Sequence, residues 1–200
     1  GALVAISVAD LLTGNEADRG QHAQAVRSRL QELQSELGVR FPVYVMFTKC
    51  DLMAGFNEFF DDLGRGEREQ VWGVTFDLEQ SSKAPPVERI PEELRRLGQR
   101  LSSQVVEKMQ HERSEARRQA IYSFPQQFSA LHPLLEEFLT DVFNPTRYEE
   151  NLLLRGCYFT SATQEGTPID RVMGALSRSF GVASDRGPAS AGRGQSYFLT

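Results

Sequence analysis

The chain has 200 residues, 40% of them hydrophobic and 24% charged, so it is long enough for one elaborated domain or for two small ones. Its net charge of −5 and isoelectric point near 5.3 provide no basic face, which excludes nucleic acid and anionic lipid as expected partners. Two cysteines without a C-x-x-C spacing, three histidines and the lack of any bilayer-length apolar run exclude a disulfide framework, a structural zinc site and a membrane span.

The first predicted elements form a strand–helix–strand unit. An apolar, β-branched run from Ala2 to Ala9 is typical of a strand buried on both faces of a parallel sheet. A helix should follow, because Asn15 and Asp18 can cap its start and Gly38 can end it. A second buried strand is predicted from Phe41 to Phe47. The expected buried face of the helix consists of Ala23, Val26, Leu30, Leu33 and Leu37.

The segment after Thr48 shows helical periodicity and no convincing strand, which predicts a helical insertion over residues 55–151. Residues 81–91 are polar and proline-rich and should form an exposed loop. Residues 92–118 carry mixed charge and are predicted to form one long solvated helix, and Asn144 should end the last helix. The aromatic residues Phe56, Phe59, Phe60, Trp72 and Phe76 are expected in the core of this subdomain.

The sheet pattern returns at the end of the chain. A third strand is predicted from Leu152 to Thr160, followed by a helix that Thr167 caps and a flexible linker over 181–195. The predicted division is therefore 1–54 for the first part of the α/β core, 55–151 for the insertion, 152–181 for the last strand and helix, and 182–200 for the linker and the start of a following segment. Because the chain opens on an apolar strand and stops within an apolar stretch, we expect an excised piece of a longer protein. Both cysteines, Cys50 and Cys157, are expected to be buried and reduced.

The first candidate site follows the second strand directly. Thr48, Lys49 and Asp51 form a T-K-x-D string at the end of a buried strand, where open α/β sheets bind ligands. The carboxylate of Asp51 can accept two hydrogen bonds from the N–H edge of guanine, and the stem of Lys49 can lie along the purine face. Adenine lacks that pair of donors and would be rejected.

The second candidate site, Ser161-Ala162-Thr163, follows the third strand, where small residues let backbone N–H groups approach a ligand carbonyl. Together the two sites resemble the base-recognition pair N-K-x-D and S-A-K of Ras-like GTPases. Thr48 replaces the asparagine that braces the phosphate loop, and Thr163 replaces a lysine, so guanine specificity is weakened.

The phosphate-binding loop is missing from this sequence. A Walker A motif needs a lysine after a glycine, and none of Lys49, Lys83 and Lys108 follows one. Asp10 closes an apolar run as a Walker B aspartate would, but its partner motif is absent. We therefore assign no catalytic residue, no metal ligand and no hydrolysis to this piece. The predicted fold class is α/β, a partial P-loop NTPase or GTPase-like three-layer domain of parallel strands with an all-helical insertion.

Longer strings resemble the IcmF/TssM family, the large inner-membrane protein of bacterial type VI secretion. They lie at residues 5–12, 39–52, 68–73 and 155–170. The resemblance implies a cytoplasmic domain between transmembrane helices, with membrane contact only through segments outside this chain and any Walker A motif upstream. GTP or ATP with Mg²⁺ is implied for the complete domain only. Implied partners are other membrane-complex proteins and the baseplate of the secretion machine. Self-association is a separate option, because strands missing from this piece would leave backbone groups unpaired at one edge of the sheet.

Two functions remain open from the sequence. The first is a structural scaffold in which the insertion docks the baseplate or a neighbouring subunit, and this is the preferred interpretation for the chain as it stands. The alternative is a nucleotide-binding domain of an NTPase that powers or switches secretion, with the phosphate loop lying upstream.

Overall fold

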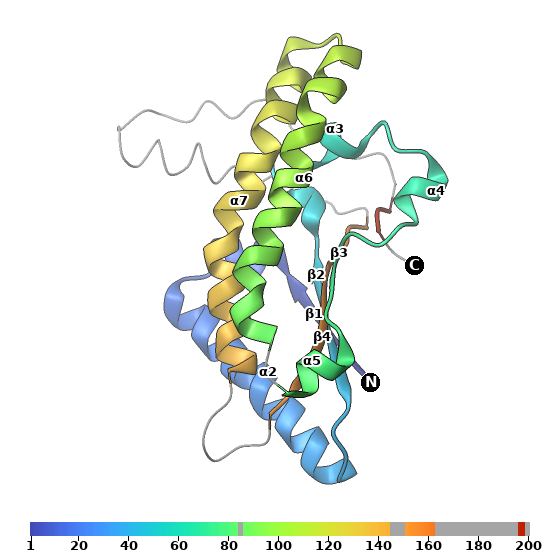
Figure 1. Cartoon of the computed structure of the whole chain (residues 1–200). Helices are drawn as coiled ribbons and strands as arrows, with labels where there is room; N and C mark the ends of the chain where they lie inside the picture. Colours follow the sequence, from blue (N-terminus) through green and yellow to red (C-terminus); the bar gives the residue numbers. More distant parts are fainter. Residues whose placement is uncertain (84–85, 145–150, 163–195, 199–200) are drawn as a thin grey trace.

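A central sheet organises the computed structural model, which describes residues 1–83, 86–144, 151–162 and 196–198 (Figure 1). Its four strands lie in the order β1-β2-β4-β3. β1 (Ala2–Ser7), β2 (Pro42–Thr48) and β4 (Leu153–Phe159) are parallel, and β3 (Gly73–Thr75) joins β4 antiparallel. The prediction of a mixed α/β domain with parallel strands is confirmed. The finer assignment to a three-layer P-loop fold remains a prediction.

β1 is shorter and more exposed than its sequence suggests. The strand ends at Ser7, whose side-chain oxygen accepts a hydrogen bond from the Asp10 amide at 3.3 Å and so begins α1 (Val8–Thr13). Within the described residues β1 pairs with β2 alone, and Leu3 is 64% exposed. The prediction of burial on both faces is wrong for this strand, because it lies at the edge of the sheet.

The helix after α1 confirms the capping prediction. α2 (Glu16–Leu37) begins with a capping box between Asn15 and Asp18 and ends at Gly38, which adopts a left-handed φ of 64°. Its buried residues are Ala23, Leu30 and Gln34. Leu37 is 62% exposed, so the predicted apolar face is wrong in its last turn, which extends past the end of α7 (Figure 1).

The predicted insertion contains a strand. After η1 (Cys50–Leu52), α3 (Phe56–Phe60) and α4 (Arg65–Arg68), the chain forms β3, so the expectation of no strand in this segment is wrong. Three residues are too few for an alternating pattern to show in the sequence. Gly73 permits the pairing, since a Cβ there would lie 2.3 Å from the carbonyl oxygen of Cys157.

The charged stretch forms a helical hairpin. α6 (Ile90–His111) and α7 (Glu115–Phe143) pack side by side, so the prediction of one helix over residues 92–118 is wrong. The chain turns where Ser114 caps α7, and its own amide donates to the carboxylate of Glu112 at 2.8 Å. α7 ends at Phe143 before Asn144, as predicted.

The predicted loop at 81–91 is also partly helical. α5 (Leu78–Lys83) runs into it, η2 (Pro86–Arg89) and the start of α6 lie within it, and Ser81 is buried. The helix expected after Thr167 and the linker expected over 181–195 lie outside the described residues.

The core lies between one face of the sheet and the helices α2, α3, α6 and α7. Val43, Val45 and Phe47 of β2 point into it, and Trp72 contacts an aromatic cluster around them. The members of this cluster are Phe56, Phe59, Phe60, Trp72, Phe124, Phe128, Phe159, Tyr197 and Phe198. The aromatic residues expected in the core are buried, apart from Trp72, which is partly buried, so their place in a core is confirmed. That core is shared with the sheet and is not confined to the predicted insertion.

The two cysteines are free and buried, which confirms the prediction. Burial raises the pKa of the Cys157 thiol to about 12 and also raises that of Cys50. Both thiols therefore remain protonated at neutral pH and serve as small apolar groups. None of the helices in the described parts of the chain is both long and apolar enough to cross a bilayer.

Candidate functional site

The end of β2 carries the first predicted site. Thr48 donates from its hydroxyl to the carbonyl oxygen of Ile6 at 3.3 Å, which ties β2 to β1. Lys49 then adopts a left-handed conformation with φ 60° and ψ 36°, which is uncommon for a residue other than glycine. This turn brings the amide of Cys50 to 3.2 Å from the carbonyl oxygen of Thr160, just after β4. The carboxyl ends of β2 and β4 are thereby joined.

The two predicted motifs meet at this edge. The hydroxyl of Ser161 donates to Oδ1 of Asp51 at 2.5 Å, although the two residues are 110 positions apart in the chain. The bond fixes the orientation of the carboxylate. Within the described residues Oδ2 of Asp51 has no protein donor, so its lone pairs can accept hydrogen bonds from a planar N–H edge.

A third segment, which the sequence did not place here, completes the edge. Both backbone polar groups of Ser161 pair with Tyr197, at 2.9 Å and 2.8 Å, and Tyr197 is 4% exposed. Ser161 therefore offers its hydroxyl to the site and not its N–H. Phe198 follows in a left-handed conformation and donates its amide to the carbonyl oxygen of Arg68 at 2.6 Å.

The other predicted site residues lie around this edge or outside the described part of the chain. Lys49 and Ala162 are half-buried beside the edge, and Thr163 lies outside the described residues. Asp10 is exposed on α1. Among the residues that the structure describes, no three His, Cys, Asp or Glu side chains are grouped as metal ligands. The edge thus presents an oriented carboxylate beside a hydroxyl, and base recognition at this edge stays a prediction.

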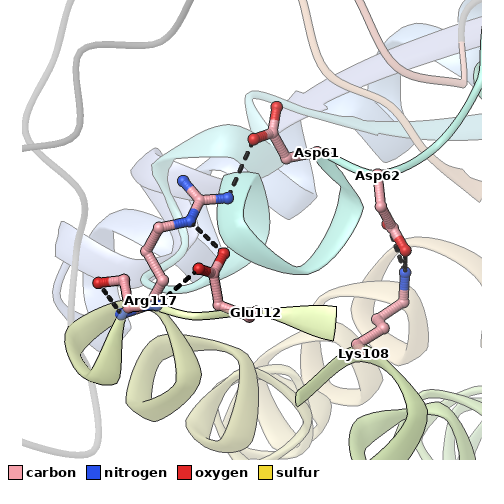
Figure 2. A network of polar contacts seen from close by, with 6 residues as sticks. Asp61, Asp62, Lys108, Glu112 and Arg117 are labelled. Carbon is pink, nitrogen blue, oxygen red and sulfur yellow. Dashed lines mark hydrogen bonds and ion pairs between the residues drawn. The ribbon is translucent and has the colours of Figure 1, made fainter. Parts of the chain in front are cut away.

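A second polar site lies where α3 meets the tip of the hairpin (Figure 2). Arg117 donates to Asp61 at 2.9 Å and to Glu112 at 2.6 Å, while Lys108 donates to the two carboxylate oxygens of Asp62 at 2.6 Å and 2.9 Å. The amide of Ser114 and the guanidinium of Arg117 lower the pKa of Glu112. These groups border a pocket of about 180 Å³.

Sequence reasoning missed this second site. It treated the charges of residues 92–118 as a solvated face, yet the Lys108 side chain is only 10% exposed and its ammonium lies 5.0 Å from the centre of the Phe59 ring. Arg117 and Asp61 are 56 positions apart. No local spacing could have paired them, because the contact depends on the hairpin that the sequence did not predict.

Comparison with known proteins gives one consistent result. The family model described as the IcmF-related N-terminal domain matches residues 1–200. A relative, the type VI secretion system component TssM1 of Pseudomonas aeruginosa, is 53% identical over 200 residues, which is 100% of this chain and 18% of that protein. The chain thus spans less than a fifth of the relative that it matches. No solved structure matches the chain.

Proposed function

Because the chain belongs to the family of the IcmF-related N-terminal domain, as its sequence strings predicted, we propose that it is a docking part of a type VI secretion component. In this proposal the longer protein lies in the bacterial inner membrane with this portion on the cytoplasmic side. The chain connects the membrane complex, through other membrane-complex proteins, to the baseplate. Support comes from the similarity to TssM1, which extends over the full length of the chain.

The α6–α7 hairpin is the docking surface that the geometry supports best. It extends well beyond the strands of the sheet and presents its tip to the surroundings (Figure 1). Val106 on α6 and Tyr122 on α7 are 66% and 58% exposed, near the end of the hairpin that carries the polar site. In this proposal the two side chains contribute to the buried centre of the interface, where apolar and aromatic residues are enriched.

The test places charges on this surface in the full-length protein. Val106→Glu combined with Tyr122→Glu should abolish recruitment of the baseplate while the membrane complex still assembles, as followed by fluorescence microscopy of tagged components. Leu37→Glu is the matched control, since Leu37 is equally exposed but lies on α2. Normal recruitment by the double variant would rule the hairpin out. Deleting residues 91–144 is a poorer test, because α7 supplies much of the core.

A second candidate function, nucleotide binding, is favoured by one observation, the hydrogen bond from Ser161 that orients the carboxylate of Asp51. In the complete domain the base of GTP or ATP would contact Thr48, Lys49, Asp51 and the segment 161–163, with Mg²⁺ and the phosphates held upstream. This proposal keeps the predicted domain division of the chain, with an α/β core at 1–54 and 152–181, an insertion at 55–151 and a linker with the start of a following segment at 182–200.

Calorimetric titration of GTP, GDP and ATP into the full-length protein tests the nucleotide site. We expect guanine-selective binding that Asp51→Ala abolishes and that Glu36→Ala, an exposed substitution on α2, leaves unchanged. A folded wild-type protein that binds none of the three nucleotides would contradict this second function and leave the docking proposal intact.

A further inference from the structure

The candidate base edge and the hairpin tip are the two ends of one short, hydrogen-bonded segment. Asp51 lies in η1, and Asp61 directly follows α3. Between them the amide of Met53 bonds to the carbonyl of Cys50 at 3.0 Å, that of Phe56 to Met53 at 3.1 Å and that of Phe59 to Gly55 at 2.9 Å. These backbone hydrogen bonds link η1 to α3.

The hairpin holds the far end of this segment through two separate ion pairs. Asp61 binds Arg117 at the start of α7, and Asp62 binds Lys108 in the last turn of α6. Figure 2 shows both carboxylates facing the two arms of the hairpin. Because each arm has its own carboxylate, a change in the position of either arm acts on the end of α3.

The segment between η1 and α3 also packs directly against α7. Gly55 has a left-handed φ of 85°, and a Cβ built on it would lie 2.4 Å from the carbonyl oxygen of Ala120 on α7. Phe56 and Phe59 pack against Phe124 with ring centres 5.8 Å and 5.0 Å apart. α3 therefore contacts α7 through apolar packing as well as through the ion pair between Asp61 and Arg117.

We infer that the ion pairs between α3 and the hairpin tip couple the hairpin to the Asp51–Ser161 edge. A partner that displaces the tip shifts α3, and α3 carries η1 away from or toward the end of β4. The identity of the tip as a docking surface rests on the proposed function. The coupling itself is a property of this chain alone.

Residue-resolved hydrogen exchange of this segment in the full-length protein tests the coupling. Asp61→Asn removes the charge that binds Arg117, and we expect the Cys50 amide, which bonds to Thr160, to exchange at least threefold faster. Glu92→Gln is the matched control, since Glu92 pairs with Arg95 and Arg96 within α6 only. This control should leave the Cys50 amide unchanged. Faster exchange confined to α3 and the tip would overturn the inference.

A second variant keeps the test decisive if Asp61→Asn is unstable. Asp62→Asn removes the charge that binds Lys108, and we expect the Cys50 amide to exchange faster in this variant too. Folded Asp62→Asn protein in which that amide exchanges at the wild-type rate would show that the ion pairs do not carry the coupling. Neither readout requires a nucleotide or a partner, so failure here is distinct from failure of the docking proposal.

Discussion

At the residue scale, single polar groups define the candidate edge. Lys49 turns the chain in a left-handed conformation, and Ser161 contacts both Asp51 and Tyr197. The sequence predicted the two motifs at strand ends, where open α/β sheets bind ligands. The strand order that makes β2 and β4 neighbours comes from the structure. It did not predict Tyr197, because a backbone pairing by one residue after a long gap has no sequence signature.

Removing the Ser161 hydroxyl should measure its bond to Asp51. We expect Ser161→Ala to lower the free energy of unfolding by about 1 kcal/mol, because the carboxylate loses a partly buried hydrogen bond. Urea denaturation is the measurement. Ser103→Ala, on the exposed face of α6, is the control and should change stability little. Equal changes in the two variants would show that the bond contributes nothing.

The buried ring of His132 should make the stability of the folded chain depend on pH. Its ring lies edge-on to Phe128 at 4.9 Å, its Nε2 has no partner among the described residues, and burial lowers its pKa from 6.5 to about 4. The unfolded chain binds the proton below about pH 6.5, whereas the folded chain does so only near pH 4. This residue should therefore reduce stability progressively as the pH falls through that window.

Urea denaturation at several pH values measures how the free energy of unfolding depends on pH. His132→Leu should make this free energy depend less on pH between about pH 6.5 and 4, because the group that titrates differently in the folded and unfolded states is gone. His111→Gln, at the exposed end of α6, should retain it. An unchanged slope in His132→Leu would mean that the ring is solvated in the folded chain.

At the element scale, the quality of each prediction depended on how local its signal was. The capping box of α2 and the end of α7 at Asn144 depend on neighbouring residues and were predicted correctly. β3 and the break between α6 and α7 depend on distant partners and were missed. The prediction that Leu37 is buried was wrong for the same reason. Burial of this side chain requires a neighbouring element, and among the described residues the last turn of α2 has none beside it.

Two glycine substitutions should act in opposite directions. Gly55→Ala should cost roughly 2–4 kcal/mol, because the added carbon meets the carbonyl of Ala120 and the left-handed backbone is strained. Gly20→Ala, inside α2 with no atom within 4 Å of the added carbon, should gain up to about 1 kcal/mol. Thermal unfolding distinguishes them, and a stable Gly55→Ala protein would contradict the tight contact between α3 and α7.

At the scale of the whole molecule, the helices of the predicted insertion supply the layer that covers the sheet. α7 packs on α2 as well as on α6, so the central helices and the α/β core share one hydrophobic core. β1 remains at an edge within the described residues, with Leu3 exposed. The hairpin thus packs on the core at its base and projects at its tip.

The most direct test of the docking proposal is the affinity of the purified full-length protein for isolated baseplate proteins. Binding is measured for the wild type and for the variant that combines Val106→Glu and Tyr122→Glu, with thermal unfolding of both as the check on folding. We predict saturable binding that the variant weakens at least tenfold, a loss of about 1.4 kcal/mol, without a change in unfolding temperature. Equal affinity of the two folded proteins would contradict the proposal that the α6–α7 hairpin docks the baseplate.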